Sequence, residues 1–186
     1  ARPVLVINTG CTKESSTVQI IPIPNGDFED WAGGPGMLSK WETNSCPVCM
    51  QPIETNIIRT DTVAYSGKYA AKFIYNNRYA AWAENRFLIP AHPTYFIGYV
   101  KSKLVTADTV SIAIKLYNNG ILIDSGKWIG TSSITNYTQI KIPLTQNNPN
   151  ADSAFIRIQG GNKIALPFPS TNTEFWVDHF SFEKLQ

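Results

Sequence analysis

Residues 25–31 read Asn-Gly-Asp-Phe-Glu-Asp-Trp, and this acidic stretch decides how the rest of the chain is interpreted. It follows a short apolar run and is rich in both acids and aromatics. Near the other end, residues 176–182 read Trp-Val-Asp-His-Phe-Ser-Phe. Residues two apart in a strand share a face, so Asp178 should lie with Trp176 and Phe180. Because a buried carboxylate needs a partner, we expect the two ends of the chain to meet over one cation.

The composition is that of a folded domain. The chain has 186 residues, of which 43% are hydrophobic and 16% charged, and its net charge is +2. This balance argues against disorder, and the length fits one domain. No basic cluster interleaves with aromatics, as a nucleic-acid groove requires. No apolar run approaches the ~20 residues of a membrane helix. We therefore expect neither nucleic-acid binding nor a membrane span.

The first sixteen residues form an arm and linker, and residues 17–186 form the body of the chain. Within the arm, residues 3–7 are apolar and read Pro-Val-Leu-Val-Ile. One interpretation is an ordinary first strand of the same sheet. Another is a donor strand for a neighbouring subunit, whose gross gain would be near ~10 kcal/mol at ~1.5–3 kcal/mol per buried side chain. A third, a lipoprotein cleavage site at Cys11, fits Asn8 poorly. The donor residues would be Val4, Leu5, Val6 and Ile7.

A Cys-x-x-Cys pair, Cys46 and Cys49, lies in a loop. A redox motif needs a helix after a strand, and Pro52 breaks such a helix early. A zinc site needs a second ligand pair, which neither cysteine nor histidine spacing supplies. We favour a local disulfide in an oxidising compartment, which leaves Cys11 as a free thiol or an intermolecular cross-link.

From residue 55 onward, short strand candidates alternate with turn signals. Residues 111–116 and 139–142 alternate at period two. Asn118-Asn119-Gly120 marks a hairpin, because Asn-Gly accepts positive φ. No amphipathic helix of useful length occurs, so the pattern predicts an antiparallel β-sandwich. The expected strands are 55–60, 68–75, 84–89, 95–103, 109–117, 121–129, 137–144, 154–159 and 173–185.

Three motifs in order resemble calcium-containing jelly-roll carbohydrate-binding modules and related galactose-binding-like domains. They are residues 25–29 with Trp41, then Tyr-Ser-Gly-Lys-Tyr-Ala at 65–70, then residues 175–182. The resemblance spans about residues 17–185, leaves the arm outside, and implies a jelly roll. Residues 137–144 and 152–156 are similar to secreted Bacteroidetes-type proteins, which implies an extracellular or cell-surface location.

The resemblance also implies a structural calcium ion, which prefers oxygen ligands. Glu29 and Asp178 would supply carboxylates, and Asp27 and Lys68 would supply backbone carbonyls. The alternative is a metal-free cluster in which Asp178 meets a lysine, an arginine or backbone N–H groups.

Glycan binding is a separate expectation. Sugar-binding modules use exposed aromatic faces and a few polar side chains. The densest candidate group is Tyr75, Asn77, Arg78, Tyr79 and Trp82. Trp128 is a second choice outside this group. Alternatively, Trp82 and Trp128 pack the core.

Catalysis is not expected. The cation explains Asp27, Glu29 and Asp178 better than a glycosidase pair does, and Glu84 has no evident partner in the sequence. No nucleophile elbow or phosphate loop occurs. Two functions remain: a secreted module that binds a polysaccharide, or a structural subunit of an extracellular filament or surface assembly that self-assembles through its arm.

Overall fold

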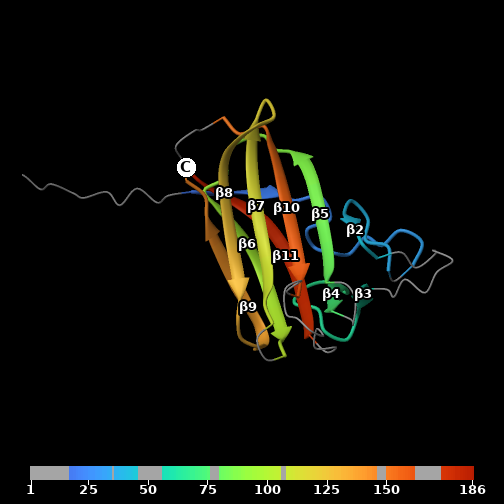
Figure 1. Ribbon diagram of the computed structural model, residues 1–186. Coiled ribbons are helices and arrows are strands. Elements are labelled where there is room, and N and C mark those ends of the chain that lie inside the picture. The colour runs from blue at the N-terminus through green and yellow to red at the C-terminus, as the bar shows by residue number, and fades with distance from the viewer. Residues whose placement is uncertain are drawn as a thin grey trace, which may run out of the picture.

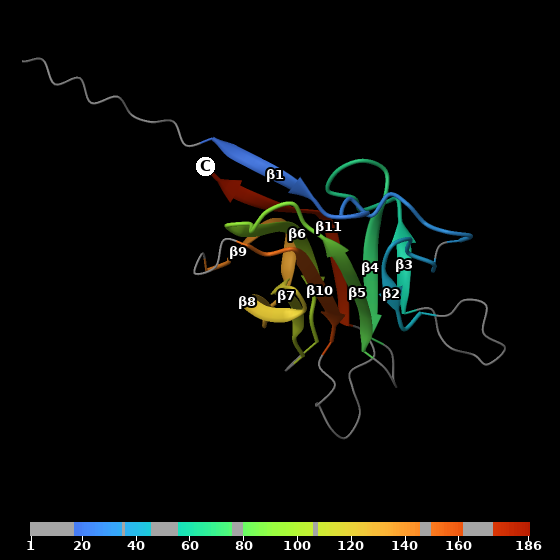
Figure 2. The ribbon, with the colours of Figure 1, turned by 90° about the horizontal axis from the view of Figure 1, so that it is seen from above.

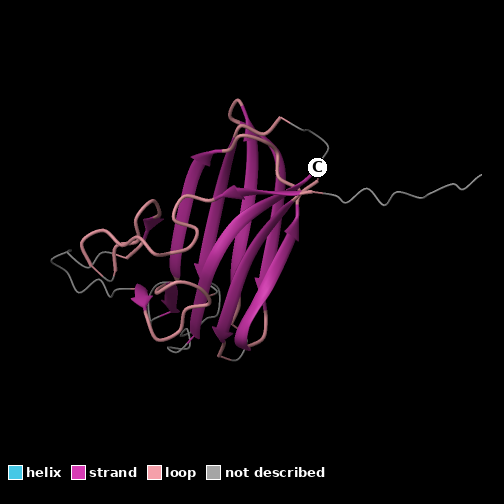
Figure 3. Ribbon diagram, turned by 180° about the vertical axis from the view of Figure 1, so that it is seen from behind, coloured by secondary structure: helices cyan, strands magenta, loops and turns pink. Residues whose placement is uncertain are grey.

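The computed structural model describes residues 17–34, 36–45, 56–75, 80–105, 108–145, 150–161 and 173–186. Every regular element in these ranges is a β-strand (Figure 3). The strands form two antiparallel sheets, which confirms the predicted β-sandwich. No helix in these ranges is long and apolar enough to cross a membrane. The predictions on the arm and on the cysteines fall outside the described residues, as do those on Asn77, Arg78 and Tyr79.

The first sheet has five strands in the order β2-β5-β10-β7-β8. In Figure 1, β8, β7, β10 and β5 lie side by side in that order. The turn between β7 and β8 places Asn119 at φ 48° and Gly120 at φ 78°, which confirms the predicted hairpin. The strands are β2 (Glu42–Thr43), β5 (Ala81–Leu88), β7 (Val110–Asn118), β8 (Ile121–Gly130) and β10 (Ser153–Gly160).

The second sheet has six strands and is built around the 13-residue β11. Its main order is β3-β4-β11-β6-β9, and β1 also pairs with β11. Figure 2 shows β1 lying along the C-terminal half of β11. The strands are β1 (Val18–Pro22), β3 (Ile57–Thr60), β4 (Ala70–Tyr75), β6 (Tyr95–Lys103), β9 (Ile134–Pro143) and β11 (Thr173–Leu185).

Two strands share one edge of β11. β6 pairs along the other edge, β4 pairs with residues 173–177, and β1 pairs with residues 181–185. The register against β6 shifts between Asp178 and Ser181, which is a bulge. Both β1 and β4 run antiparallel to β11, so β1 ends and β4 begins beside that bulge. Asp178 therefore lies at the junction of three strands.

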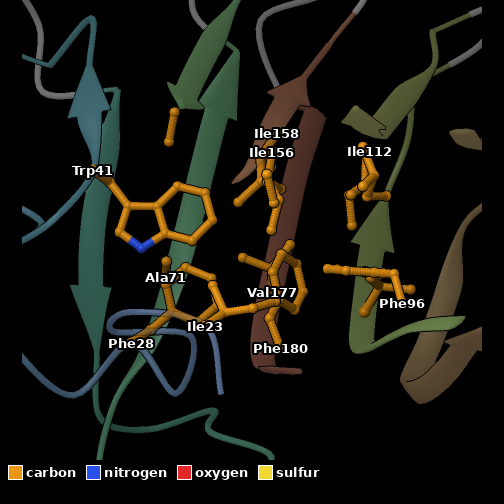
Figure 4. Close-up of a cluster of buried hydrophobic side chains, with 14 of the residues drawn as sticks. Ile23, Phe28, Trp41, Ala71, Phe96, Ile112, Ile156, Ile158, Val177 and Phe180 are labelled. Carbon is orange, nitrogen blue, oxygen red and sulfur yellow. The ribbon is translucent and has the colours of Figure 1, made fainter. Parts of the chain in front are cut away.

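The core follows from the pleat of the strands. In β7, Ile112, Ile114 and Leu116 are fully buried, whereas Lys115 between them is exposed. β11 contributes Phe175 and Val177 from the opposite sheet. Figure 4 shows part of this cluster with side chains from both sheets facing one another. Each such side chain stabilises the fold by about 1.5–3 kcal/mol when it leaves water.

The aromatics around the acidic stretch are core residues. Phe28 is fully buried, and its ring lies 5.5 Å from that of Trp41 and 5.1 Å from that of Phe180. Phe28 adopts φ 56°, a left-handed conformation that is rare for a bulky residue. Burial of the ring thus holds the backbone of the acidic motif in place.

Candidate functional site

The first candidate site is the junction at Asp178, whose side chain is fully buried. Asp178 Oδ2 accepts backbone N–H bonds from Tyr65 at 2.7 Å and Ser66 at 2.9 Å. Its Oδ1 accepts the N–H of His179 at 2.7 Å. Burial raises the pKa of Asp178, while these N–H bonds act in the opposite direction. The carboxylate is therefore held by the backbone of the loop before β4.

Glu29 holds the same loop from the acidic motif. Its Oε1 accepts the N–H of Lys68 at 2.7 Å and that of Tyr69 at 2.9 Å. Gly67 lies between the two carboxylate contacts at φ 63°. A Cβ on Gly67 would lie 2.2 Å from Glu29 Oε1, so only glycine allows Glu29 to approach. We call Glu29, Asp178 and the loop 65–69 the clasp.

The acidic motif also bonds directly to the last strand. Phe180 N donates to Gly26 O at 2.7 Å. A Cβ on Gly26 would lie 2.4 Å from the carbonyl oxygen of Phe180, which explains the glycine. The two ends of the chain meet, as predicted, and hydrogen bonds join them; the cation between them stays a prediction. The motif at residues 65–70 lies at the same place, with Tyr65 and Ser66 bonded to Asp178.

The carboxylate oxygens of the clasp are ligands that a hard cation prefers. They belong to two side chains and do not by themselves enclose an ion. No group of three acidic, histidine or cysteine side chains converges within the described part of the chain. A carboxylate has about four acceptor positions; the N–H bonds above use two on Glu29 and three on Asp178. Both therefore retain lone pairs for an ion. Asp27 is exposed and lines a surface hollow with Glu29.

A serine and a histidine meet beside the clasp. Ser66 Oγ lies 3.2 Å from His179 Nδ1, the contact that a nucleophile and its base require. However, the bonds of Asp178 go to backbone N–H groups, and no other acid among the described residues is bonded to the imidazole. Within that part of the chain, the pair therefore lacks the third member of a hydrolytic triad.

Three tyrosines cover the outer side of the clasp. The rings of Tyr65 and Tyr99 stack at 3.5 Å, and Tyr137 lies 6.0 Å from Tyr65. Tyr137 donates its hydroxyl to Val63 O at 3.1 Å. Burial raises the pKa of Tyr137 well above its ordinary value, and the Asp178 charge adds to the effect. The rings of Tyr65 and Tyr99 also lie 6.1 and 6.0 Å from that of His179, beside Asp178.

The second candidate site is the outer face of the five-stranded sheet. Strand register aligns the outward residues of β5, β10, β7 and β8 in four rows. The rows are Trp82–Gln159–Ser111–Ile129, Glu84–Arg157–Ala113–Lys127, Arg86–Phe155–Lys115–Ser125 and Leu88–Ser153–Tyr117–Leu122.

Trp82 stands at one corner of this face. The Arg157 guanidinium lies 5.2 Å from its ring centroid, within cation–π range. Arg157 also forms an ion pair with Glu84, so Glu84 does have a partner. The side chain of Trp82 is half-buried. Tryptophan and arginine thus present a fixed aromatic and polar surface.

A hollow lies at the opposite end of the same face. It has a volume of about 440 Å³ and is lined by Arg86, Leu88, Tyr117, Gly120, Ser153 and Phe155, among others. Leu88 is 84% exposed, which leaves an apolar wall open to solvent. The hollow therefore joins a cation, apolar surface and hydroxyl groups.

Of the other predicted glycan residues that the structure describes, Trp128 and Tyr75 do not join the face that carries Trp82. Trp128 pairs with Ile112 and stacks on Phe175 at 6.0 Å, so it faces the core side of β8 rather than the face that carries Trp82. Tyr75 ends β4 in the other sheet. The hollow was missed because Phe155 resembles a core residue in sequence. Its outward position is established by the register of β10 with β5 and β7. One signal was present in the sequence, because Phe155 alternates with Ala154 and Ile156, which face the core.

Comparison with known proteins supports the fold. No family model matches the chain, and no curated protein matches it. Among solved structures, the carbohydrate-binding module TmCBM61, solved with β-1,4-galactotriose, has a TM-score of 0.54 and 14% identity; the match covers 88% of this chain and 97% of that one. A putative glycoside hydrolase from Bacteroides thetaiotaomicron has a TM-score of 0.60 at 10% identity, covering 87% and 70%.

The same fold occurs inside longer proteins. The enzymatically active domain of tailspike protein 4 from bacteriophage CBA120 matches with a TM-score of 0.53 and 15% identity. That match covers 88% of this chain and 21% of the tailspike chain. At these identities the comparisons establish a shared β-sandwich fold and nothing further.

Proposed function

We propose that this chain is a non-catalytic extracellular glycan-binding domain and that it binds through the outer face of the five-stranded sheet. The observation that carries the proposal is the alignment of Trp82, Arg157 and Arg86 with the hollow on one solvent-facing surface. A fold alone does not assign a function, so this surface is the stronger argument. The kinship in fold with a carbohydrate-binding module agrees with it.

The chemistry of the face suits a sugar. Carbohydrates present apolar ring faces and hydroxyl groups, and aromatic side chains with a few fixed polar groups bind both. Trp82 offers the ring, and Arg157 and Gln159 offer donors in adjoining rows. Because the Glu84 ion pair and the Trp82 ring position Arg157, binding costs little side-chain entropy.

A binding role explains the acids of this face better than hydrolysis does. Glu42 stands opposite Glu84 in the strand register, so two carboxylates are neighbours there. Glycosidases place such a pair on opposite sides of a bound sugar bond. Here Glu84 is engaged by Arg157, and the hollow lies at the far end of the face. Glu42 and Glu84 are therefore cross-strand neighbours that do not line this hollow.

Affinity electrophoresis against neutral and acidic polysaccharides tests the proposal. We expect retention by at least one of them, and Trp82→Ala should weaken it about tenfold, as loss of a ring contact of about 1–1.5 kcal/mol does. Tyr95→Ala, on the other sheet, is the matched control and should bind normally. If no polysaccharide retards the chain, or if the control variant loses binding and Trp82→Ala does not, the proposal fails. Release of reducing ends during incubation would show catalysis instead.

We also propose that the clasp takes up calcium. Glu29 and Asp178 would supply carboxylate oxygens, with backbone carbonyls of Asp27 and Lys68 completing the set. What supports this is that both carboxylates reach one five-residue loop and keep free lone pairs. The ion would strengthen the joint between β1, β4 and β11, so its role is structural.

A second candidate function is assembly into an extracellular filament or surface layer. The observation that favours it is an apolar strip on β1 and the end of β11: Val18 is 51% exposed, Ile20 56% and Leu185 39%. Val18 pairs with Leu185, so all three share a face. Donation of residues 3–7 to a neighbour would start from this strip. Deleting residues 1–10 should leave particles monomeric by light scattering and electron microscopy, whereas assembly unchanged by the deletion would exclude the arm.

A further inference from the structure

We propose that the glycan bound by this face is anionic, and that Arg86 and Lys115 recognise its acidic group. The inference rests on the proposed glycan-binding function and narrows its ligand to acidic polysaccharides. Three observations support it: the charge of the face, the contacts of Arg86 and Lys115 with the Phe155 ring, and the hollow beside them.

The outer face of the five-stranded sheet carries an excess of cations. Its described outward positions hold the cations Arg86, Lys115, Lys127 and Arg157 and the acids Glu42 and Glu84. The ion pair with Arg157 occupies Glu84. The nearby Asp152 accepts Asn119 N at 2.6 Å and Ser153 Oγ at 2.7 Å, so its carboxylate is also engaged. Glu42 lies on β2 opposite Glu84, and Lys127 lies on β8 in the row of Glu84 and Arg157. Arg86 and Lys115 share the next row and are the two cations beside the hollow, so they are the pair placed to attract an anion there.

Phe155 holds these two cations in place. The Arg86 guanidinium carbon lies 4.3 Å from the centroid of the Phe155 ring, and Lys115 Nζ lies 5.9 Å from it. The three residues form one row across β5, β10 and β7. Only 7% of Phe155 is exposed because the cations cover its ring. This accounts for a phenylalanine that points outward yet is buried.

The position of the Arg86 guanidinium over the Phe155 ring suits recognition of a carboxylate or sulfate. A guanidinium stacked on a ring keeps its N–H edge free, and that edge matches the two oxygens of an acidic group. Stacking also fixes the long arginine side chain before a ligand arrives, which lowers the entropy cost of binding. Lys115, which lies on β7 at the other side of Phe155, adds a second positive charge. A neutral sugar would leave both cations unused.

The adjoining hollow fits a sugar ring attached to that acidic group. Its volume of about 440 Å³ lies within the range of small-ligand sites. Leu88 and Tyr117 form its apolar side, one row beyond Arg86 and Lys115. Adjacent rows are two residues apart along a strand, about 6–7 Å, which is on the order of one sugar unit. A uronate could place its ring face on Leu88 and Tyr117 and its carboxylate on Arg86.

Titration against polygalacturonate, and against its carboxyl-reduced neutral form, tests the inference. We expect the acidic polymer to bind at least tenfold more tightly, with affinity falling between 50 and 500 mM NaCl because salt screens exposed charges. Arg86→Gln and Lys115→Gln should each lower the affinity about tenfold or more. Lys103→Gln, an exposed lysine on β6 of the other sheet, should change it less than twofold. A sulfated galactan distinguishes sulfate from carboxylate recognition.

Three outcomes would overturn the inference. Equal affinity for the acidic and the carboxyl-reduced polymer would refute it and leave the glycan-binding function standing. Salt-sensitive binding that Lys103→Gln weakens as much as Arg86→Gln would show unspecific charge attraction. Failure to bind any polysaccharide, charged or neutral, would remove the proposed function as well. Melting curves of each variant are measured alongside, and Lys115→Gln keeps the test decisive if Arg86→Gln does not fold.

Discussion

Substituting Gly67 by alanine measures the strength of the clasp. The residue has φ 63°, and a Cβ there would lie 2.2 Å from Glu29 Oε1. Alanine in the left-handed region costs about 1–2 kcal/mol. Displacing Glu29 removes two N–H bonds to its carboxylate; because this group is partly exposed, we count about 1–2 kcal/mol for them. The expected loss of unfolding free energy for Gly67→Ala is thus about 2–4 kcal/mol.

Gly120 provides a matched control for this substitution. It has φ 78°, and a Cβ there meets no atom within 4 Å. Gly120→Ala should therefore lower the free energy of unfolding only by the cost of alanine in the left-handed region, about 1–2 kcal/mol. For a domain of this size each kcal/mol lowers the melting temperature by about 2–4 °C. Urea unfolding followed by tryptophan fluorescence gives both free energies directly.

A double-mutant cycle separates the contact from the backbone strain. In a Glu29→Ala background the clash disappears, so Gly67→Ala should then cost no more than Gly120→Ala. If Gly67→Ala and Gly120→Ala destabilise the unmodified chain equally, Glu29 does not restrain the loop and the clasp has been misassigned.

Three further predictions concern the same region. Gly26→Ala should cost about 3 kcal/mol or more, because its Cβ meets the Phe180 backbone at 2.4 Å; urea unfolding checks this, and a change below 1 kcal/mol contradicts it. Calcium should raise the melting temperature and excess EDTA should lower it, whereas identical melts with no metal found by mass spectrometry would exclude a structural ion. The raised pKa of Tyr137 means that the folded chain keeps a proton which the unfolded chain releases above about pH 10. Stability should therefore fall as pH rises from about 10, and Tyr137→Phe should reduce that fall in alkaline urea titrations; an unchanged slope would contradict it.

The fold was predictable wherever one local signal sufficed. The alternation of residues 111–116 and the Asn-Gly turn after them predicted β7, β8 and their hairpin, and all three are present. The limits of residues 95–103 and 173–185 agree with β6 and β11. The start of β5 at Ala81 was missed because small alanines carry little strand propensity.

The sites depended on which strands are neighbours, and a sequence does not state this. Asp178 was expected to need a partner, and that partner is the backbone of the loop before β4, which carries no residue-type signal. Arg86 and Phe155 lie far apart in the chain and meet only through the register of β5 with β10. Trp82 was identified from its neighbours in sequence, yet its ring is positioned by Arg157 from β10. The sequence was enough to select Trp82 as a candidate, but not to predict that Arg157 lies against its ring.

The pairing of β1 with β11 brings the two ends of the described body to one corner of the molecule (Figure 2). Thr17 Oγ1 lies 2.9 Å from Gln186 Oε1, and Gln186 N donates to Thr17 O at 3.0 Å. A short linker could join these ends without crossing either sheet, so a circular permutant opened at the exposed Asn119-Gly120 turn should retain the fold. For the same reason the body could be inserted into a surface loop of another protein, with both connections leaving from a single point and the outer face of the five-stranded sheet left free.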